Sequence, residues 1–196
     1  MQQSHKELFA RIAYYKRHKE FDSGLVSKVL KQADEHGAEY VISNISDESR
    51  ELYTKSREVG CESHRAQGFL RFSEAGEALI AKAEFEHDII DIVLDHFMKR
   101  FPRKKLVIIS RGKAYVGERG LVVIEDPFKY NFGDVSIKRA ADLDWQAYYD
   151  SQYIEARRNR KLAMSHVPKK IWKKFGIAEG NKIDKGIIAC KLTSFI

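Results

Sequence analysis

The side chains best suited to chemistry gather in one short stretch, Cys61–Phe72, which holds a carboxylate, an imidazole and two guanidinium groups. Glu62 and His64 are candidates for proton transfer, because a carboxylate and an imidazole within hydrogen-bond reach can act as general acid and base. At about 100° per residue, the two fall on opposite sides of a helix's apolar stripe, so local geometry alone does not bring them together. A surface ion pair between Glu62 and Arg65 is the competing interpretation.

A further histidine, His96, stands one helical turn before Arg100. It is a third catalytic candidate, able to act as a general base or, once protonated, to contact phosphate; packing at the edge of a core is the alternative. Cys61 and His64 offer two metal ligands at i,i+3 spacing, but zinc takes three or four, so we predict no metal site.

Several common reaction classes lose support because their sequence signatures are missing. The chain has no phosphate-binding loop, no dinucleotide glycine fingerprint, no Gly-x-Ser-x-Gly elbow and no zinc-deaminase pattern. The sequence therefore indicates no cofactor, and it argues against the usual nucleotide-hydrolysing and hydrolase mechanisms.

The sharpest basic feature is the run Arg157-Arg158-Asn159-Arg160-Lys161, which is followed by lysines around Trp172. On a helix this run wraps more than one turn, so Arg157, Arg160 and Lys161 form its consistent stripe. Aromatic side chains interleave with these charges and can stack on the bases of single-stranded or extruded nucleic acid. The alternative is that the aromatic side chains are core and the charges are their solvated back.

Positive charge is concentrated in one part of the chain, whose formal net charge is +7. Residues 1–98 carry 13 basic and 18 acidic side chains, whereas residues 99–175 carry 19 basic and 8 acidic ones. Such asymmetry is typical of a surface that binds a polyanion, because each cation that meets a phosphate releases counterions. A merely solubilising surface would have the same bias.

Hydrophobic periodicity predicts an α+β fold in a single domain, with an N-terminal helical layer, a mostly antiparallel sheet and C-terminal helices. The domain should cover residues 1–175, and residues 176–196 should form an extension with one strand. The predicted helices are Ser4–Lys19, Ser23–His36, Asp47–Gln67, Asp88–Phe101, Leu143–Ser165 and Pro168–Phe175. The predicted strands are Phe69–Phe72, Ala78–Phe85, Leu106–Ser110, Ala114–Gly117, Leu121–Glu125 and Gly186–Leu192.

The sequence also predicts a cytoplasmic protein. Its apolar runs fall short of the roughly 18 to 20 residues that a spanning helix needs, and its N-terminus resembles a charged helix rather than a signal peptide. The two cysteines stand far apart, so reduced thiols are expected.

Three groups of these residues together resemble a known family. They are Glu62-x-His64-Arg65-x-x-Gly68-Phe69-x-Arg71-Phe72, then His96-Phe97-x-x-Arg100, then Arg157-x-Asn159-x-Lys161-Leu162 with Pro168 and Trp172. In this order and spacing they resemble a bacterial and archaeal family called "probable DNA metabolism protein", from about Ser4 to Phe175. Its members tend to be encoded beside a radical-SAM protein linked to uracil-DNA glycosylases, and some are fused to a glycosylase-like domain. The resemblance implies DNA repair or modification but supplies no mechanism.

The leading hypothesis is therefore a DNA-binding protein that processes a nucleotide or damaged base, with Glu62, His64 and His96 lining a polar pocket. The expected nucleic-acid contacts are Arg65, Arg71, Arg100, Arg111, Arg157, Asn159, Lys161 and Trp172. One alternative is a non-catalytic partner that docks onto a radical-SAM or uracil-DNA-glycosylase-like protein and leaves apolar surface exposed for it. Another is an RNA-binding protein, since basic helices and aromatic side chains serve both nucleic acids.

Overall fold

The structure is a computed structural model that describes residues 2–118, 120–130, 159, 161–162 and 165. The chain divides into two compact units. We call the first, Met1–Gly68 with Phe85–Arg100, the helical unit, and the second, Phe69–Glu84 with Phe101–Ile196, the sheet unit.

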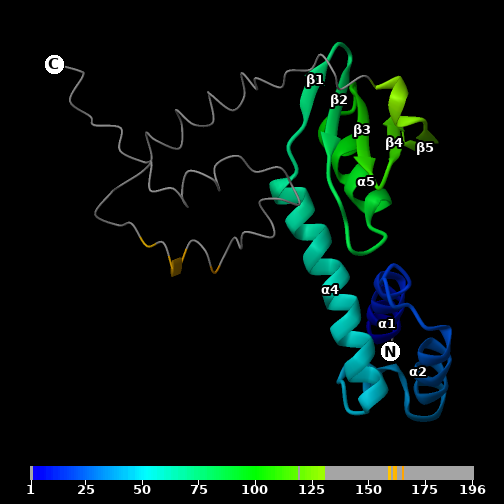
Figure 1. The fold of residues 1–196 in the computed structure, drawn as a ribbon. Coiled ribbons are helices and arrows are strands. Elements are labelled where there is room, and N and C mark those ends of the chain that lie inside the picture. Colours follow the sequence, from blue (N-terminus) through cyan, green and yellow to red (C-terminus); the bar gives the residue numbers. More distant parts are fainter. Residues whose placement is uncertain (1, 119, 131–158, 160, 163–164, 166–196) are drawn as a thin grey trace. The chain divides into compact units, whose positions relative to one another are not determined.

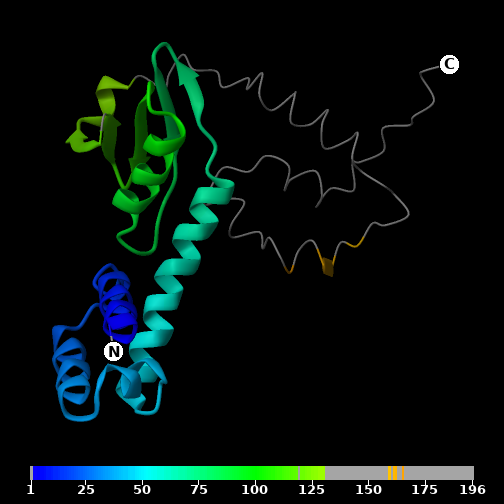
Figure 2. The same ribbon diagram turned by 180° about the vertical axis from the view of Figure 1, so that it is seen from behind.

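The helical unit is built from amphipathic helices whose apolar side chains recur every three or four residues. Its described helices are α1 (Gln2–Tyr15), α2 (Ser23–His36), α3 (Ala38–Ile42), α4 (Asp47–Phe69, whose last residue is counted with the sheet unit) and α5 (Ile90–Arg100) (Figure 1). One core cluster joins the first four of them through Leu8, Ile12, Tyr15, Leu25, Val29, Ala38, Val41 and Leu52. Figure 1 and Figure 2 both show α1 beside the N-terminal half of α4.

The connection between α1 and α2 is held by defined hydrogen bonds. The hydroxyl of Tyr15, a fully buried residue, accepts a hydrogen bond from the backbone N–H of Asp22 at 2.9 Å. The Asp22 carboxylate in turn caps α2 by accepting from the N–H of Gly24 at 2.8 Å. These bonds fix residues 16–22, the segment that carries His18.

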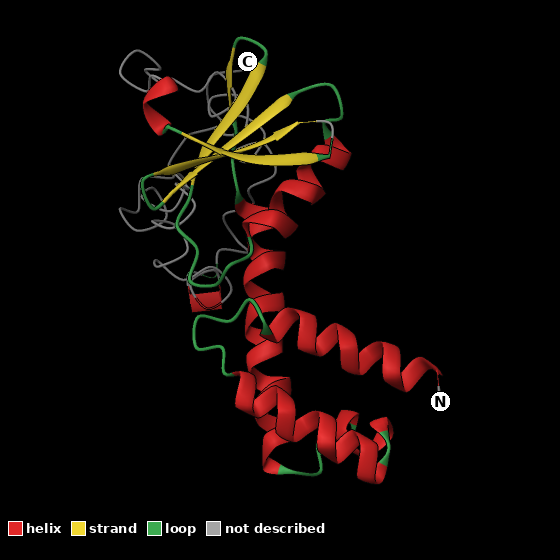
Figure 3. Ribbon diagram, turned by 90° about the vertical axis from the view of Figure 1, so that its right-hand side faces the viewer, coloured by secondary structure: helices red, strands yellow, loops and turns green. Residues whose placement is uncertain are grey.

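The described strands of the sheet unit are β1 (Ser73–Ala75), β2 (Ala78–Lys82), β3 (Lys105–Ser110), β4 (Lys113–Glu118) and β5 (Leu121–Glu125), and they form one sheet in sequence order. The β2–β3 pair is parallel, and the other pairs are antiparallel. Figure 3 shows the strands fanning out with the twist usual for an open sheet. Residues Leu106–Ser110 of the central strand β3 are all buried, as its near-continuous apolar sequence requires.

A two-residue turn joins β3 to β4, since Ser110 pairs with Lys113 across it. Both turn residues have positive φ, 48° at Arg111 and 73° at Gly112. This is the combination that a type I′ hairpin turn needs, and its twist matches that of the flanking strands. The exposed Arg111 side chain is thus presented at a hairpin tip.

The structure confirms the predicted α+β class with N-terminal helices and a mostly antiparallel sheet. The bounds predicted for Ser23–His36 and Leu121–Glu125 agree with α2 and β5. The predicted strand Phe69–Phe72 is wrong, because α4 continues through Gly68 to Phe69 and the first strand begins at Ser73. The short helix α3 was not predicted.

The predicted helices after residue 143 and the predicted C-terminal strand lie outside the described residues, apart from positions 159, 161–162 and 165. The predicted boundary at residue 175 also lies outside them. Within the described part of the chain, no helix is long and apolar enough to cross a membrane.

Gly60 offers a direct test of α4, because it lies inside the helix. A Cβ added there would meet the Tyr14 ring at 4.0 Å, an ordinary van der Waals contact. Alanine is preferred over glycine in a helix interior, so Gly60→Ala should raise the free energy of unfolding by about 0.5–1 kcal/mol in urea titrations. Gly37→Ala is the contrasting control, since a φ of +88° at Gly37 should make that substitution destabilising. A destabilised Gly60→Ala variant would contradict the open surroundings of this position.

Candidate functional site

Helix α4 carries two carboxylates, Glu58 and Glu62, at i,i+4 spacing and therefore on one face. Glu62 is buried, with 7% of its surface exposed. Its Oε1 accepts a hydrogen bond from the N–H of Glu86 at 2.8 Å, and its Oε2 accepts one from the N–H of His87 at 2.9 Å. Glu62 thus anchors the segment before α5 and fixes where the His87 ring lies.

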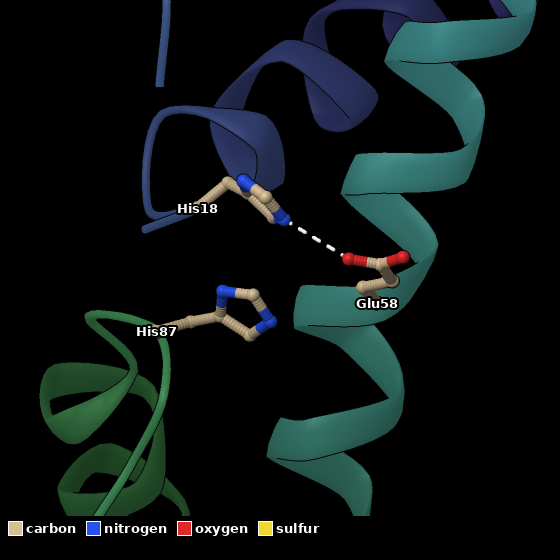
Figure 4. A group of neighbouring side chains, drawn as sticks. All are labelled: His18, Glu58 and His87. Atoms are coloured by element: carbon tan, nitrogen blue, oxygen red, sulfur yellow. Dashed lines mark hydrogen bonds and ion pairs between the residues drawn. The ribbon is translucent and has the colours of Figure 1, made fainter. Parts of the chain in front are cut away.

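Glu58, one turn earlier on α4, belongs to a group of three side chains that we call the His18–Glu58–His87 cluster. His18 and His87 are buried, whereas Glu58 is exposed. The Nε2 of His18 lies 3.0 Å from Oε2 of Glu58, and the centroids of the two imidazole rings are 4.6 Å apart. One ligand atom from each of the three residues lies within 4.8 Å of the other two. Figure 4 shows the three side chains pointing toward one another.

Backbone hydrogen bonds fix the tautomer of each neutral ring. The Nδ1 of His18 accepts from the N–H of Glu20 at 3.0 Å, and the Nδ1 of His87 accepts from the N–H of Lys19 at 3.3 Å. A nitrogen that accepts a hydrogen bond carries no proton, so each neutral ring carries its proton on Nε2. The Nε2–H of His18 consequently donates to Glu58.

The Nε2 of His87 differs from that of His18, because it has no hydrogen-bond partner among the described residues although its side chain is buried. Burial lowers the pKa of His87, and the neighbouring His18 lowers it further, against the opposing effect of Glu62, Glu86 and Glu58. The ring is therefore held in its neutral form, with one polar atom unsatisfied.

Further contacts hold the segments of the cluster together. The Arg17 guanidinium pairs with the Asp91 carboxylate on α5, with Nη2 2.6 Å from Oδ2. The carbonyl of Arg17 accepts from the N–H of Asp88 at 2.9 Å. Lys19 forms a longer, exposed ion pair with Glu86 at 3.6 Å. The segments that carry His18 and His87 are thus joined directly, next to the face of α4.

The predicted catalytic residues have different surroundings. Glu62 is buried on backbone amides, His64 lies exposed on the same helix, and His96 is half-buried on α5. The His96 ring meets the neighbouring Phe97 ring edge-on, with centroids 5.1 Å apart. A catalytic role for Glu62, His64 or His96 stays a prediction.

The predicted nucleic-acid contacts that the structure describes lie at the surface: Arg65, Arg71, Arg100, Arg111, Asn159 and Lys161. The Asn159 side-chain oxygen accepts from the N–H of Leu162 at 3.0 Å, as an N-capping residue does. Arg157 and Trp172 lie outside the described residues.

Comparison with known proteins gives one result. A family model described as a domain of unknown function, DUF4130, matches residues 22–176, which is most of the chain. The chain belongs to this family. No curated protein and no solved structure shows significant similarity to it. The DUF4130 match includes Glu58, Glu62 and His87, and it begins after His18.

Sequence reasoning missed His18, Glu58 and His87 in this DUF4130 chain. The i,i+4 spacing of Glu58 and Glu62 indicates a shared face of α4, and this was the available sequence signal. The two histidines lie in connecting segments, where periodicity says nothing about side-chain direction. Their meeting depends on how residues 16–22 and 85–89 pack against α4.

Proposed function

We propose that this protein binds DNA and acts in DNA repair or modification. The observation that carries the proposal is the concentration of basic residues in 99–175, with 19 basic and 8 acidic side chains. The sequence resemblance to the "probable DNA metabolism protein" family supports the choice of DNA. Phosphate contacts by lysine and arginine supply most of the non-specific affinity of such proteins.

The sheet unit supports the proposal with a hollow of about 710 Å³ that exposes cationic side chains. Its lining includes the cations Arg103, Lys104, Lys105 and Lys129, together with Tyr130. Two carboxylates, Glu77 and Glu118, also line it.

The cations of this hollow differ in their pairing. Lys104 lies 3.3 Å from Glu74, and Lys129 lies 3.4 Å from Glu125. The ammonium of Lys105 lies 5.4 Å from the centre of the Tyr130 ring. Arg103 is exposed and has no ion-pair partner among the described residues. Its guanidinium is therefore ready to contact a phosphate without breaking an existing pair.

Binding should be measured on single-stranded, duplex, uracil-containing and abasic DNA, with an RNA control, over a series of salt concentrations. We expect affinity to fall steeply as the salt concentration rises. The slope of the logarithm of the binding constant against the logarithm of the salt concentration should be smaller by about one in Arg103→Ala and in Arg157→Ala, because each variant loses one phosphate contact. Arg57→Ala is the matched control, since Arg57 lies exposed on α4 in the helical unit.

If the salt dependence of affinity has the same slope in Arg103→Ala, Arg157→Ala and the control, these arginines do not contact phosphate. Preference for RNA would replace DNA by RNA as the ligand. Preference for uracil-containing or abasic DNA would support a repair function and would identify the lesion. Absence of binding above the non-specific level would overturn the proposal.

One observation favours a second candidate function, a non-catalytic partner that docks onto a radical-SAM or uracil-DNA-glycosylase-like protein. Strand β5 ends the strand order of the described sheet, and four consecutive large apolar side chains of β5 are 42% to 71% exposed. An exposed apolar edge strand is a common place for another chain to add a strand. The four side chains are Leu121, Val122, Val123 and Ile124. Co-purification with such a partner, in the absence of DNA binding, would favour this alternative.

A further inference from the structure

We propose that the His18–Glu58–His87 cluster binds one divalent transition-metal ion, with Zn²⁺ as the best match to its ligand types. Two imidazoles and one carboxylate form a ligand set that zinc uses in catalytic sites, where a water molecule takes the fourth position. The proposal concerns the helical unit and is independent of DNA binding by the sheet unit.

The first argument is the convergence of the three side chains. His18 follows α1, Glu58 lies on α4 and His87 precedes α5, so distant parts of the sequence meet at one place. Their ligand atoms lie within 4.8 Å of one another. Ligands about 2.0–2.2 Å from a tetrahedral ion are separated by roughly 3.4 Å, so small side-chain rotations suffice to close the site.

The second argument is the unsatisfied nitrogen of His87. A buried polar atom without a partner is costly, and in native proteins such an atom often marks an unseen water molecule or ion. The His87 side chain is directed into the cluster in Figure 4, and 6% of the residue is exposed. A metal ion would take this nitrogen together with His18 and Glu58 once the proton of the His87 ring moves to Nδ1, which then gives up the hydrogen bond from the N–H of Lys19.

The third argument concerns the support around the ligands. Glu62 holds the backbone of His87 through two amide hydrogen bonds, and ion pairing of Arg17 with Asp91 fixes the segment before His18. These contacts hold the two segments that carry the histidines in place. Glu58, whose side chain is 54% exposed, leaves one side of the cluster open to water and to an entering ion.

Metal binding has a specific consequence for the backbone. An ion that takes the Nε2 lone pair of His18 displaces the proton there, and the neutral ring then carries its proton on Nδ1. That nitrogen can no longer accept the hydrogen bond from the N–H of Glu20, which must find another partner. The Glu20 amide therefore reports directly on metal binding at this cluster.

The test is a Zn²⁺ titration of the full chain after removal of metals with a chelator, followed by calorimetry and by amide NMR. We expect one ion per chain, an increased melting temperature and a shifted Glu20 amide resonance. Glu58→Gln removes the anionic ligand at an exposed position and should weaken binding by at least the roughly 10- to 100-fold typical of lost outer-shell contacts. Co²⁺ provides a second readout through its visible absorption spectrum.

His64→Gln is the matched control, because His64 is an exposed histidine on the same helix. This variant should bind Zn²⁺ as tightly as the unchanged chain. His87→Asn adds a second loss-of-ligand variant whose folding is checked by circular dichroism. Absence of stoichiometric binding, or binding that Glu58→Gln keeps and His64→Gln loses, would overturn the proposal. An unchanged Glu20 amide in the zinc-bound protein would also contradict it.

Discussion

Replacing Glu62 by alanine is expected to lower the free energy of unfolding by about 2–5 kcal/mol, because two backbone N–H groups lose their acceptor at roughly 1–3 kcal/mol each. These groups belong to Glu86 and His87, which Glu62 binds through separate carboxylate oxygens. Glu62→Gln keeps one acceptor and should lose about half as much. Urea unfolding followed by circular dichroism measures both variants.

Glu51→Gln is the matched control for this prediction. Glu51 lies exposed on α4 and pairs with Lys55 at 2.9 Å, a surface contact worth about 0.5 kcal/mol or less. Wild-type stability in Glu62→Ala would refute the anchoring role of Glu62 and would favour the catalytic role predicted from the sequence. A large loss of stability would instead explain Glu62 as part of the scaffold that holds His87.

The fold could be predicted from the sequence where a periodic pattern met a clear end signal. Gly37 was a stop signal for α2, and the predicted span of about Ser23 to His36 agrees with the helix. The prediction placed the end of α4 too early, at about Gln67, because Gly68 was interpreted as the junction between a helix and a strand. Glycine lowers helix propensity without forbidding a helix, and no neighbouring atom lies within 4 Å of a Cβ built on Gly68.

The site could be predicted less well, for a physical reason. The sequence identified Glu62 as a special residue, but its geometry comes from amides that lie 24 and 25 residues away in the chain. The cluster of His18, Glu58 and His87 likewise depends on three segments packing together. Local patterns specify which face of a helix a side chain shares, and they do not specify which loop that face will meet.

The second large effect expected is a loss of stability on acidification, which we attribute to His87. The pKa of His87 is lowered in the folded protein, first by burial and then by the adjacent His18. In the unfolded chain an imidazole has a pKa of about 6.5, so the unfolded state takes up the proton first as the pH falls. The stabilisation is therefore present above about pH 6.5 and is lost as the pH falls toward the lowered pKa, with a slope of at most about 1.4 kcal/mol per pH unit for this proton.

Urea unfolding of the metal-free protein between about pH 8 and pH 5 measures this slope. Glutamine at position 87 cannot take up the proton, yet its carbonyl can still accept the hydrogen bond from the N–H of Lys19, which lies 3.3 Å from the ring in the unchanged chain. His87→Gln should therefore flatten the pH dependence, whereas His64→Gln at an exposed position should leave it as it is. The same slope in His87→Gln and in the unchanged chain would show that another group is responsible. A flattened slope would establish that the neutral imidazole of His87 is the form built into the fold, and this is also the form in which a histidine binds a metal ion.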